Sequence, residues 1–167
     1  MAYRNRISQM LQEEHRSTVG LMERLERFIA RHRRGGPPDV AERGVAPLLA
    51  DLSTAMQTEV QRHFAFEEEH LFSYLSDMGD DAIGTHLTDE HTAIRPIGIR
   101  MAEMARAAAT QGFDQASWEE FRRLGLELCE RMLAHVQKEE MALLPLIEES
   151  MDADTEERLH EEYSSTV

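Results

Sequence analysis

Six residues in this sequence have the types and the spacing to hold metal ions inside a helical core. Four are histidines on apolar helical stripes, and two are glutamates that each follow one of these histidines by four residues. They are His15, His63, Glu67, His91, His135 and Glu139. Neutral imidazole and carboxylate are ligands suited to iron and related metals. The single cysteine, Cys129, permits neither an internal disulfide nor a thiolate zinc site.

The helical register of the sequence turns these side chains toward one face. His15 follows Leu11 by four residues, and at about 100° per residue this spacing puts the imidazole inside an apolar stripe. The other three histidines have the same relation to apolar residues three or four positions away. Each glutamate follows its histidine by four residues, which stacks a carboxylate over an imidazole on the inward face. We therefore expect all six side chains to face a single core.

Polar groups of this kind need partners when they are buried. Leaving the imidazoles and carboxylates unpaired in a hydrophobic core would cost several kcal/mol for each charged group. Two divalent or trivalent metal ions bridged by the glutamates would offset that cost, because a cation reverses the penalty of burying a carboxylate. The sequence therefore predicts a dinuclear metal site.

Clusters of glycine, proline and polar residues divide the chain into long segments that must position these ligands. The clusters lie at residues 35–38, 79–84, 111–114 and 151–154. Each of the four long segments has apolar residues at helical spacing, and none alternates as a strand does. Because short connections make consecutive helices antiparallel, the predicted fold is all-α: an up-down-up-down four-helix bundle with a short C-terminal fifth helix. We expect one domain over residues 1–167, with a core at 5–150 and a helical tail at 152–163.

Local signals predict details of these helices. Ser117 with Glu120, and Asp154 with Glu157, have the spacing of a capping box, which favours a helix start at each position. Pro145 lies inside a helical pattern, where proline removes a backbone hydrogen bond and bends the helix.

The sequence also contains an internal repeat. The second and fourth segments align at an offset of 72 residues, which matches His63 to Glu68 with His135 to Glu140. The first and third segments align at an offset of 76 residues, which matches Glu14 and His15 with Glu90 and His91. The chain therefore resembles a duplicated helical hairpin, and we expect a pseudo-twofold axis along the bundle.

The amino-acid composition argues against two kinds of partner, nucleic acids and membranes. Acidic residues outnumber basic ones by 32 to 18, and the net charge of -14 would repel a nucleic acid. No apolar run approaches the roughly 20 residues of a membrane helix, and residues 1–19 are unlike a signal peptide. We therefore expect a cytoplasmic protein that binds neither nucleic acid nor membrane.

In the order of its six core residues, the chain resembles the hemerythrin-like family, also called the HHE cation-binding domain, over about residues 5–150. The resemblance implies a non-heme di-iron centre with an oxo or hydroxo bridge and an open position for dioxygen, peroxide or nitric oxide. It implies that Glu67 and Glu139 bridge the two irons. It also implies that each iron binds the histidines of one half: His15 with His63, and His91 with His135.

The sequence departs from the oxygen-carrying hemerythrins in two places. Those proteins have H-x-x-x-H on the third helix and H-x-x-x-x-D on the fourth, whereas here Leu87 lies four residues before His91 and the fourth helix has a glutamate at a spacing of four. His86 is the candidate for the missing ligand. Five residues rotate it about 140° from His91 on a regular α-helix, so only a π-bulge would bring both to one metal. Glu59, Tyr74 and solvent are the competing candidates.

Several functions stay open. The leading hypothesis is a di-iron protein that binds or senses dioxygen or a related ligand, such as hydrogen peroxide or nitric oxide. The alternatives are an enzyme that turns over peroxide or nitric oxide, a protein of iron supply or iron–sulfur repair, and a metal-free structural bundle. Glu67-x-x-His70 has the spacing used in ferritin-like bundles, but its second match lies in the tail, so that fold ranks second. The sequence also leaves open a homodimer or a partner protein.

Overall fold

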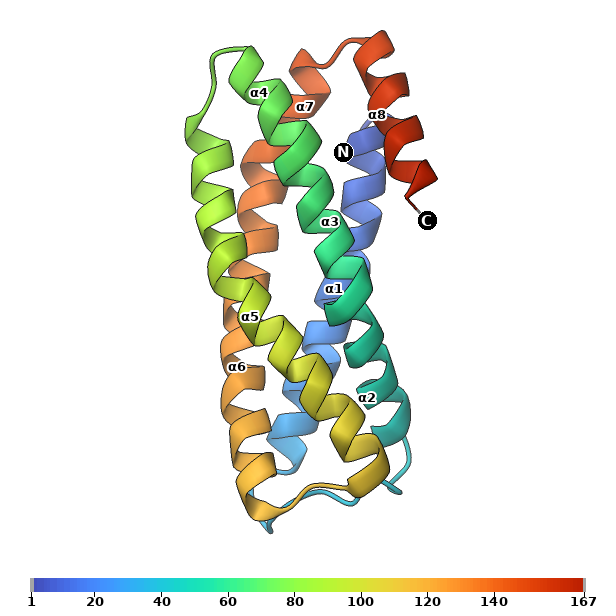
Figure 1. Cartoon of the computed structure of the whole chain (residues 1–167), viewed down its shortest axis with the longest axis vertical. Coiled ribbons are helices and arrows are strands. Elements are labelled where there is room, and N and C mark those ends of the chain that lie inside the picture. Colours follow the sequence, from blue (N-terminus) through green and yellow to red (C-terminus); the bar gives the residue numbers. More distant parts are fainter. Residues whose placement is uncertain (1, 167) are drawn as a thin grey trace.

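Long helical segments run antiparallel along the molecule and are joined by short turns at its two ends (Figure 1). The computed structural model describes residues 2–166; it is 84% helical, and these residues form no strand. The first and third segments are single helices, α1 (Arg6–Arg31) and α5 (Ala82–Gln111). The short C-terminal helix α8 (Ala153–Ser165) packs against α1. The predicted all-α bundle with a short fifth helix is confirmed.

The second and fourth segments contain π-helical turns between their α-helical pieces. The second segment consists of α2 (Val45–Thr54), η1 (Ala55–Glu59), α3 (Val60–Phe66), η2 (Glu67–Leu71) and α4 (Phe72–Asp77). The fourth consists of α6 (Gln115–Lys138), η3 (Glu139–Leu143) and α7 (Leu144–Ser150). The turns η2 and η3 begin at Glu67 and Glu139, two equivalent positions of the sequence repeat. Such turns are frequent at functional sites.

The π turn η3 also accommodates Pro145. Proline has no backbone N–H, so it cannot continue an α-helix without losing a hydrogen bond. Here Pro145 falls in the first turn of α7, directly after η3, where no such bond is required.

Aspartates cap two helices earlier than the sequence patterns predicted. Asp114 caps α6, because its Oδ1 accepts from the N–H of Ser117 at 2.7 Å and its own N–H donates to the Ser117 hydroxyl at 3.0 Å. Ser117 therefore occupies the N3 position of the capping box and not its N-cap. Asp152, not Asp154, caps α8 by accepting from the N–H of Thr155 at 2.7 Å. Both capping aspartates have the extended backbone that an N-cap needs.

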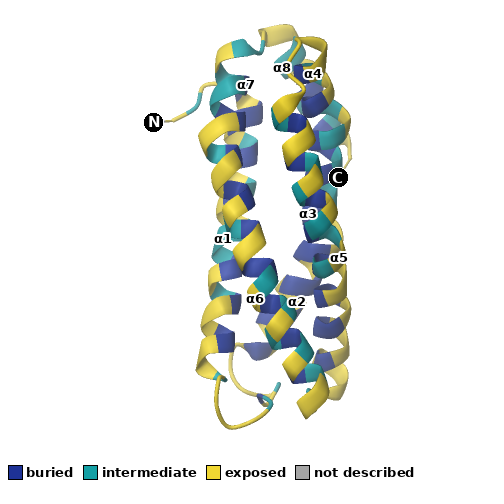
Figure 2. Ribbon diagram, turned by 90° about the vertical axis from the view of Figure 1, so that its left-hand side faces the viewer, coloured by how far each residue is buried: buried dark blue, intermediate teal, exposed yellow. Residues whose placement is uncertain are grey.

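Buried residues lie mainly on the inward faces of the helices (Figure 2), and the apolar ones form two hydrophobic clusters. The larger includes Phe28, Trp118 and Phe121, near the turn between α5 and α6. The smaller includes Ile7 and Leu143, near α8. The six predicted ligand residues are all buried and lie between these two clusters along their helices. No helix among residues 2–166 is long and apolar enough to cross a membrane.

Candidate metal centre

The six predicted side chains meet in the polar layer between the two hydrophobic clusters. Glu67, His91 and Glu139 are fully buried, and the other three histidines are at most 8% exposed. Nitrogen and oxygen atoms of these residues form two groups, and within each group the atoms lie within 4.8 Å of one another. One group is His15, His63, Glu67 and Glu139, and the other is Glu67, His91, His135 and Glu139. The two groups therefore share both glutamates.

Each shared glutamate divides its two oxygens between the groups. The oxygens of Glu67 lie 3.0 and 3.3 Å from the Nε2 atoms of one histidine in each group. Oε2 of Glu139 lies 2.6 Å from Nε2 of His15, and its Oε1 lies 2.5 Å from Nε2 of His135. A carboxylate in this position can bind one cation through each oxygen.

Whether these residues suit a metal ion can be judged from the polar groups around the two carboxylates. All four oxygens of Glu67 and Glu139 are buried. Histidine Nε2 atoms face them at 2.5 to 3.3 Å, but no group in residues 2–166 makes a hydrogen bond of regular geometry to them. Nε2 of His15 is likewise buried without a hydrogen bond of regular geometry, although it lies 2.6 Å from Oε2 of Glu139. Buried polar atoms nearly always have hydrogen-bond partners in proteins, and two buried carboxylates among four imidazoles are unfavourable unless protons or cations balance their charge. The donor set therefore fits divalent or trivalent cations placed between the inward-facing atoms.

Further glutamates surround this layer and contact the outer nitrogens of the histidines. In one half of the bundle, Nδ1 of His63 donates to Oε2 of Glu14 at 2.5 Å. Nδ1 of His15 donates to Oε1 of Glu140 at 2.7 Å. An ionised carboxylate only accepts, so each of these ring nitrogens must hold a proton. A proton on Nδ1 leaves Nε2 to bind a metal, and the outer carboxylate fixes the orientation of the ring.

The other half of the bundle repeats this arrangement with one contact lengthened. Nδ1 of His135 donates to Oε2 of Glu90 at 2.7 Å. Nδ1 of His91 lies 3.6 Å from Glu68, which is too long for a hydrogen bond. Sequence reasoning gave no role to the four outer glutamates. The internal repeat of the sequence could have identified them, because it matches Glu14 with Glu90 and Glu68 with Glu140.

Charges within the layer shift one another's ionisation in the metal-free protein. Burial opposes ionisation of Glu139, but its contacts with four histidines hold its pKa well below the usual range. Burial alone would lower the pKa of His135, but its contacts with Glu139 outweigh this effect and raise the pKa to about 9. The pKa values of the other three histidines are also raised, because contacts with glutamates outweigh burial. A metal ion that binds here must therefore displace protons.

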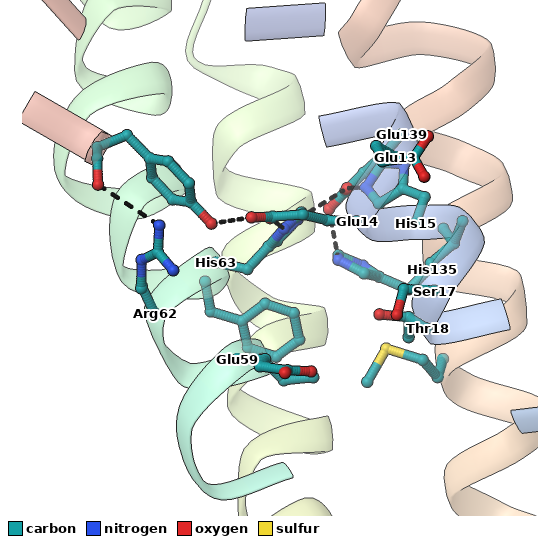
Figure 3. A pocket seen from close by; sticks show the side chains of 15 residues that line it. Glu13, Glu14, His15, Ser17, Thr18, Glu59, Arg62, His63, His135 and Glu139 are labelled. Carbon is teal, nitrogen blue, oxygen red and sulfur yellow. Dashed lines mark hydrogen bonds and ion pairs between the residues drawn. The ribbon is translucent and has the colours of Figure 1, made fainter. Parts of the chain in front are cut away.

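A cavity of about 400 Å³ leads from the surface into one side of this layer. It lies between α1 and the segment formed by η1 and α3 (Figure 3), and Glu59 and Arg62 line it. Its inner wall includes His15 and His63, together with apolar side chains such as Phe64. A small molecule in this cavity would reach the group that contains His15 and His63.

The structure does not bring His86 to the layer. Its side chain is 59% exposed and lies 3.5 Å from Glu90 on the outer surface. The π-bulge that would be needed to bring His86 and His91 to one metal does not form, since α5 is a continuous α-helix over this part. The rotation of about 140° between the two residues therefore persists and turns His86 to solvent.

The other residues considered as ligands also lie outside the layer. Glu59 is exposed and lines the cavity. The hydroxyl of Tyr74 donates to the backbone oxygen of Ser150 at 2.9 Å, as expected of a packed aromatic. His70 contacts Glu162 of α8 at 2.9 Å, so the Glu67-x-x-His70 pattern does not place both side chains in the core.

Comparison with known proteins agrees with this geometry. The model of the family described as Hemerythrin HHE cation binding domain matches residues 6–147. The match runs from the start of α1 into α7 and contains all six residues of the layer. No curated protein matches the chain.

Proposed function

Because the chain belongs to the Hemerythrin HHE cation binding domain family, we propose that it binds two iron ions in the buried histidine–glutamate layer and binds or senses a small ligand there. His15 and His63 would hold one ion, His91 and His135 the other, and Glu67 and Glu139 would bridge them. The observation that carries this proposal is the arrangement of the two glutamates. Their four oxygens are buried, make no hydrogen bond of regular geometry among the described residues, and are divided between two groups of donors.

The chain's own residues would prepare the site for its ligand. Iron bound there would supply redox and Lewis-acid chemistry toward dioxygen, peroxide or nitric oxide. The outer carboxylates of Glu14, Glu90 and Glu140 hold the histidines in the tautomer that directs Nε2 inward. Phe64 and the other apolar side chains that line the cavity would limit the water that reaches a metal bound there. We also propose that the whole chain acts as one domain, with α8 packed on the bundle.

A second candidate is an enzyme that turns over peroxide or nitric oxide. Each group contains two histidines and two shared glutamates, and His86 is directed to solvent. Four protein donors for each ion leave positions open for exchangeable ligands, so two reactants have room to bind. This feature favours turnover over simple reversible binding.

Elemental analysis of the protein expressed with iron, together with its visible absorption spectrum, tests the proposal. We expect two irons per chain and the absorption bands of an oxo-bridged pair. Replacing both Glu67 and Glu139 with alanine should abolish dinuclear binding while circular dichroism stays helical. Retention of two metals by that variant would refute the bridging role.

Addition of peroxide then separates the two candidates. Reversible spectral changes with dioxygen or another small ligand would support binding or sensing. Rapid gas evolution from peroxide without bleaching of the bands would support an enzyme.

A further inference from the structure

Helix α8 lies beyond the residues matched by the family model, yet it reaches the hydrogen bonds around the candidate metal centre. Its Tyr163 is 4% exposed, and its hydroxyl donates to Oε1 of Glu14. The second oxygen of Glu14 accepts from Nδ1 of His63 at 2.5 Å. Tyr163, Glu14 and His63 therefore form a continuous hydrogen-bonded relay, and Nε2 of His63 lies at its inner end.

Several contacts fix the phenol at the outer end of this relay. The guanidinium of Arg62 lies over the Tyr163 ring, 4.1 Å from its centroid, and donates to the hydroxyl of Thr166 at 3.0 Å. Arg62 and Glu14 both line the cavity, as Figure 3 shows. Leu159, one turn earlier on α8, is only 1% exposed and anchors the helix in the smaller hydrophobic cluster.

Polar contacts at two further points hold α8 on the bundle. Glu156 accepts from the backbone N–H and the side chain of Arg6 at 3.0 Å each, at the start of α1. Glu162 contacts His70 of η2 at 2.9 Å. The position of the Tyr163 hydroxyl is therefore set by the docking of the whole helix.

The equivalent relay in the other half of the bundle has a different outer end. There Glu90 accepts from His135 through one oxygen, and its other oxygen accepts from the ammonium group of Lys138. Lys138 lies on the same helix as His135, whereas Tyr163 comes from a separate helix. An ammonium offsets the charge of its carboxylate, while a neutral phenol leaves that charge in place. The two halves thus match in their histidines and glutamates but differ in what holds their outer carboxylates.

We propose that Tyr163 is a positioning residue for the metal centre, acting through Glu14 to fix the orientation and tautomer of His63. Metal binding at the position formed by His15 and His63 then depends on the docking of α8. An outer carboxylate anchored at only one oxygen is free to rotate away from its histidine, and partners of this kind typically contribute 10- to 100-fold to metal affinity. This inference rests on the proposed dinuclear function.

Titration of the metal-free full chain with Co²⁺, followed by visible absorption, tests the proposal. The wild-type chain should bind two equivalents, and failure to do so would count against the dinuclear function itself. The variant Tyr163→Phe removes the hydroxyl and keeps the packed ring. We expect it to weaken one equivalent about tenfold, with a change in the Co²⁺ absorption bands, and to leave the other within about twofold.

Tyr74→Phe is the matched control. It also removes one phenol hydrogen bond near the α8 end of the bundle, but the Tyr74 hydroxyl donates to the Ser150 backbone and not to a ligand relay. Its titration should match that of the wild type. If Tyr163→Phe binds two equivalents with wild-type affinities and bands, or if both phenylalanine variants weaken binding alike, Tyr163 has no positioning role.

Discussion

The ring of Phe64 lies parallel to the imidazole of His91, with centroids 3.7 Å apart and 8° between the planes. Phe64 directly follows His63, so α3 supplies a histidine of one half and a supporting surface for a histidine of the other. Nδ1 of His91 is buried without a hydrogen-bond partner among the described residues. Aromatic stacking therefore orients His91, whereas outer carboxylates orient the other three histidines.

Replacing Phe64 with leucine should weaken metal binding. The change removes the flat surface against His91 while keeping an apolar side chain, so we expect a loss of affinity on the order of tenfold and of stability of about 1 kcal/mol. Phe121→Leu is the control, because Phe121 is fully buried in the larger cluster away from the layer. It should reduce the free energy of unfolding similarly with unchanged Co²⁺ affinity. Equal affinities in both variants would exclude a role for the stacking.

Replacing Glu140 with glutamine should also weaken metal binding. The amide oxygen of glutamine can still accept from Nδ1 of His15, but it has no charge, which makes the imidazole a weaker metal ligand. We expect a loss of roughly 10- to 100-fold in affinity, measured by competition with a chelator. The control is Glu13→Gln, since Glu13 is exposed and pairs only with Arg16 among the described residues, at 3.2 Å. A similar effect of both changes would indicate a general loss of negative charge.

The stability of the metal-free protein should fall as the pH rises from about 6.5 to about 9. The pKa of His135 is raised from its ordinary value of 6.5 to about 9 in the folded protein. Its protonation therefore stabilises the fold fully below pH 6.5, and this contribution is lost as the pH rises through about 9. The contribution is on the order of 3 kcal/mol, measurable by chemical denaturation. The variant His135→Gln should show a flatter profile, and a profile as steep as the wild type's would contradict the assignment.

Removing His86 should leave the metal centre unchanged. Its side chain is exposed and contacts only the outer glutamate Glu90 among the described residues, at 3.5 Å. His86→Ala should therefore retain the metal content and absorption spectrum of the wild type, whereas His91→Ala should lose metal. A shifted spectrum in His86→Ala would show that α5 distorts when metal binds.

The thiol of Cys129 should be inert in the folded protein. It is fully buried and contacts the backbone oxygen of Met22 at 3.4 Å, and burial raises its pKa to about 12. Since the thiolate is the reactive form, a thiol reagent near neutral pH should modify the chain only after denaturant is added. Rapid labelling of the native protein would show that this part of the bundle opens.

The helices and the six inward-facing residues could be predicted because both depend on the helical period. His15 and Leu11 lie on the same face of their helix regardless of which helix packs against it. Their spacing along the chain is therefore enough to predict that both face the core. The outer glutamates depend on a different relation. Glu14 is adjacent to His15 in sequence, yet it binds His63 on another helix, and the period of one helix does not specify that contact.

Other features of the structure are harder to predict from the sequence. The π turns at Glu67 and Glu139 have no composition of their own, and Pro145 marks only the end of one of them. Tyr163 lies in a short amphipathic tail whose docking site is formed by the rest of the bundle. Its contact with Glu14 spans 149 positions in sequence, so only the folded chain brings the two together.

The internal repeat means that each hairpin supplies half of the histidines and glutamates of the layer. Two identical copies of residues 82–150, related by a true symmetry axis, would together supply four histidines and two shared glutamates. A symmetric pair of short chains would have to keep both metal positions the same. Joining two hairpins in one polypeptide removes that constraint, so the surroundings of one position can acquire a tyrosine from an added helix while those of the other keep a lysine from their own helix.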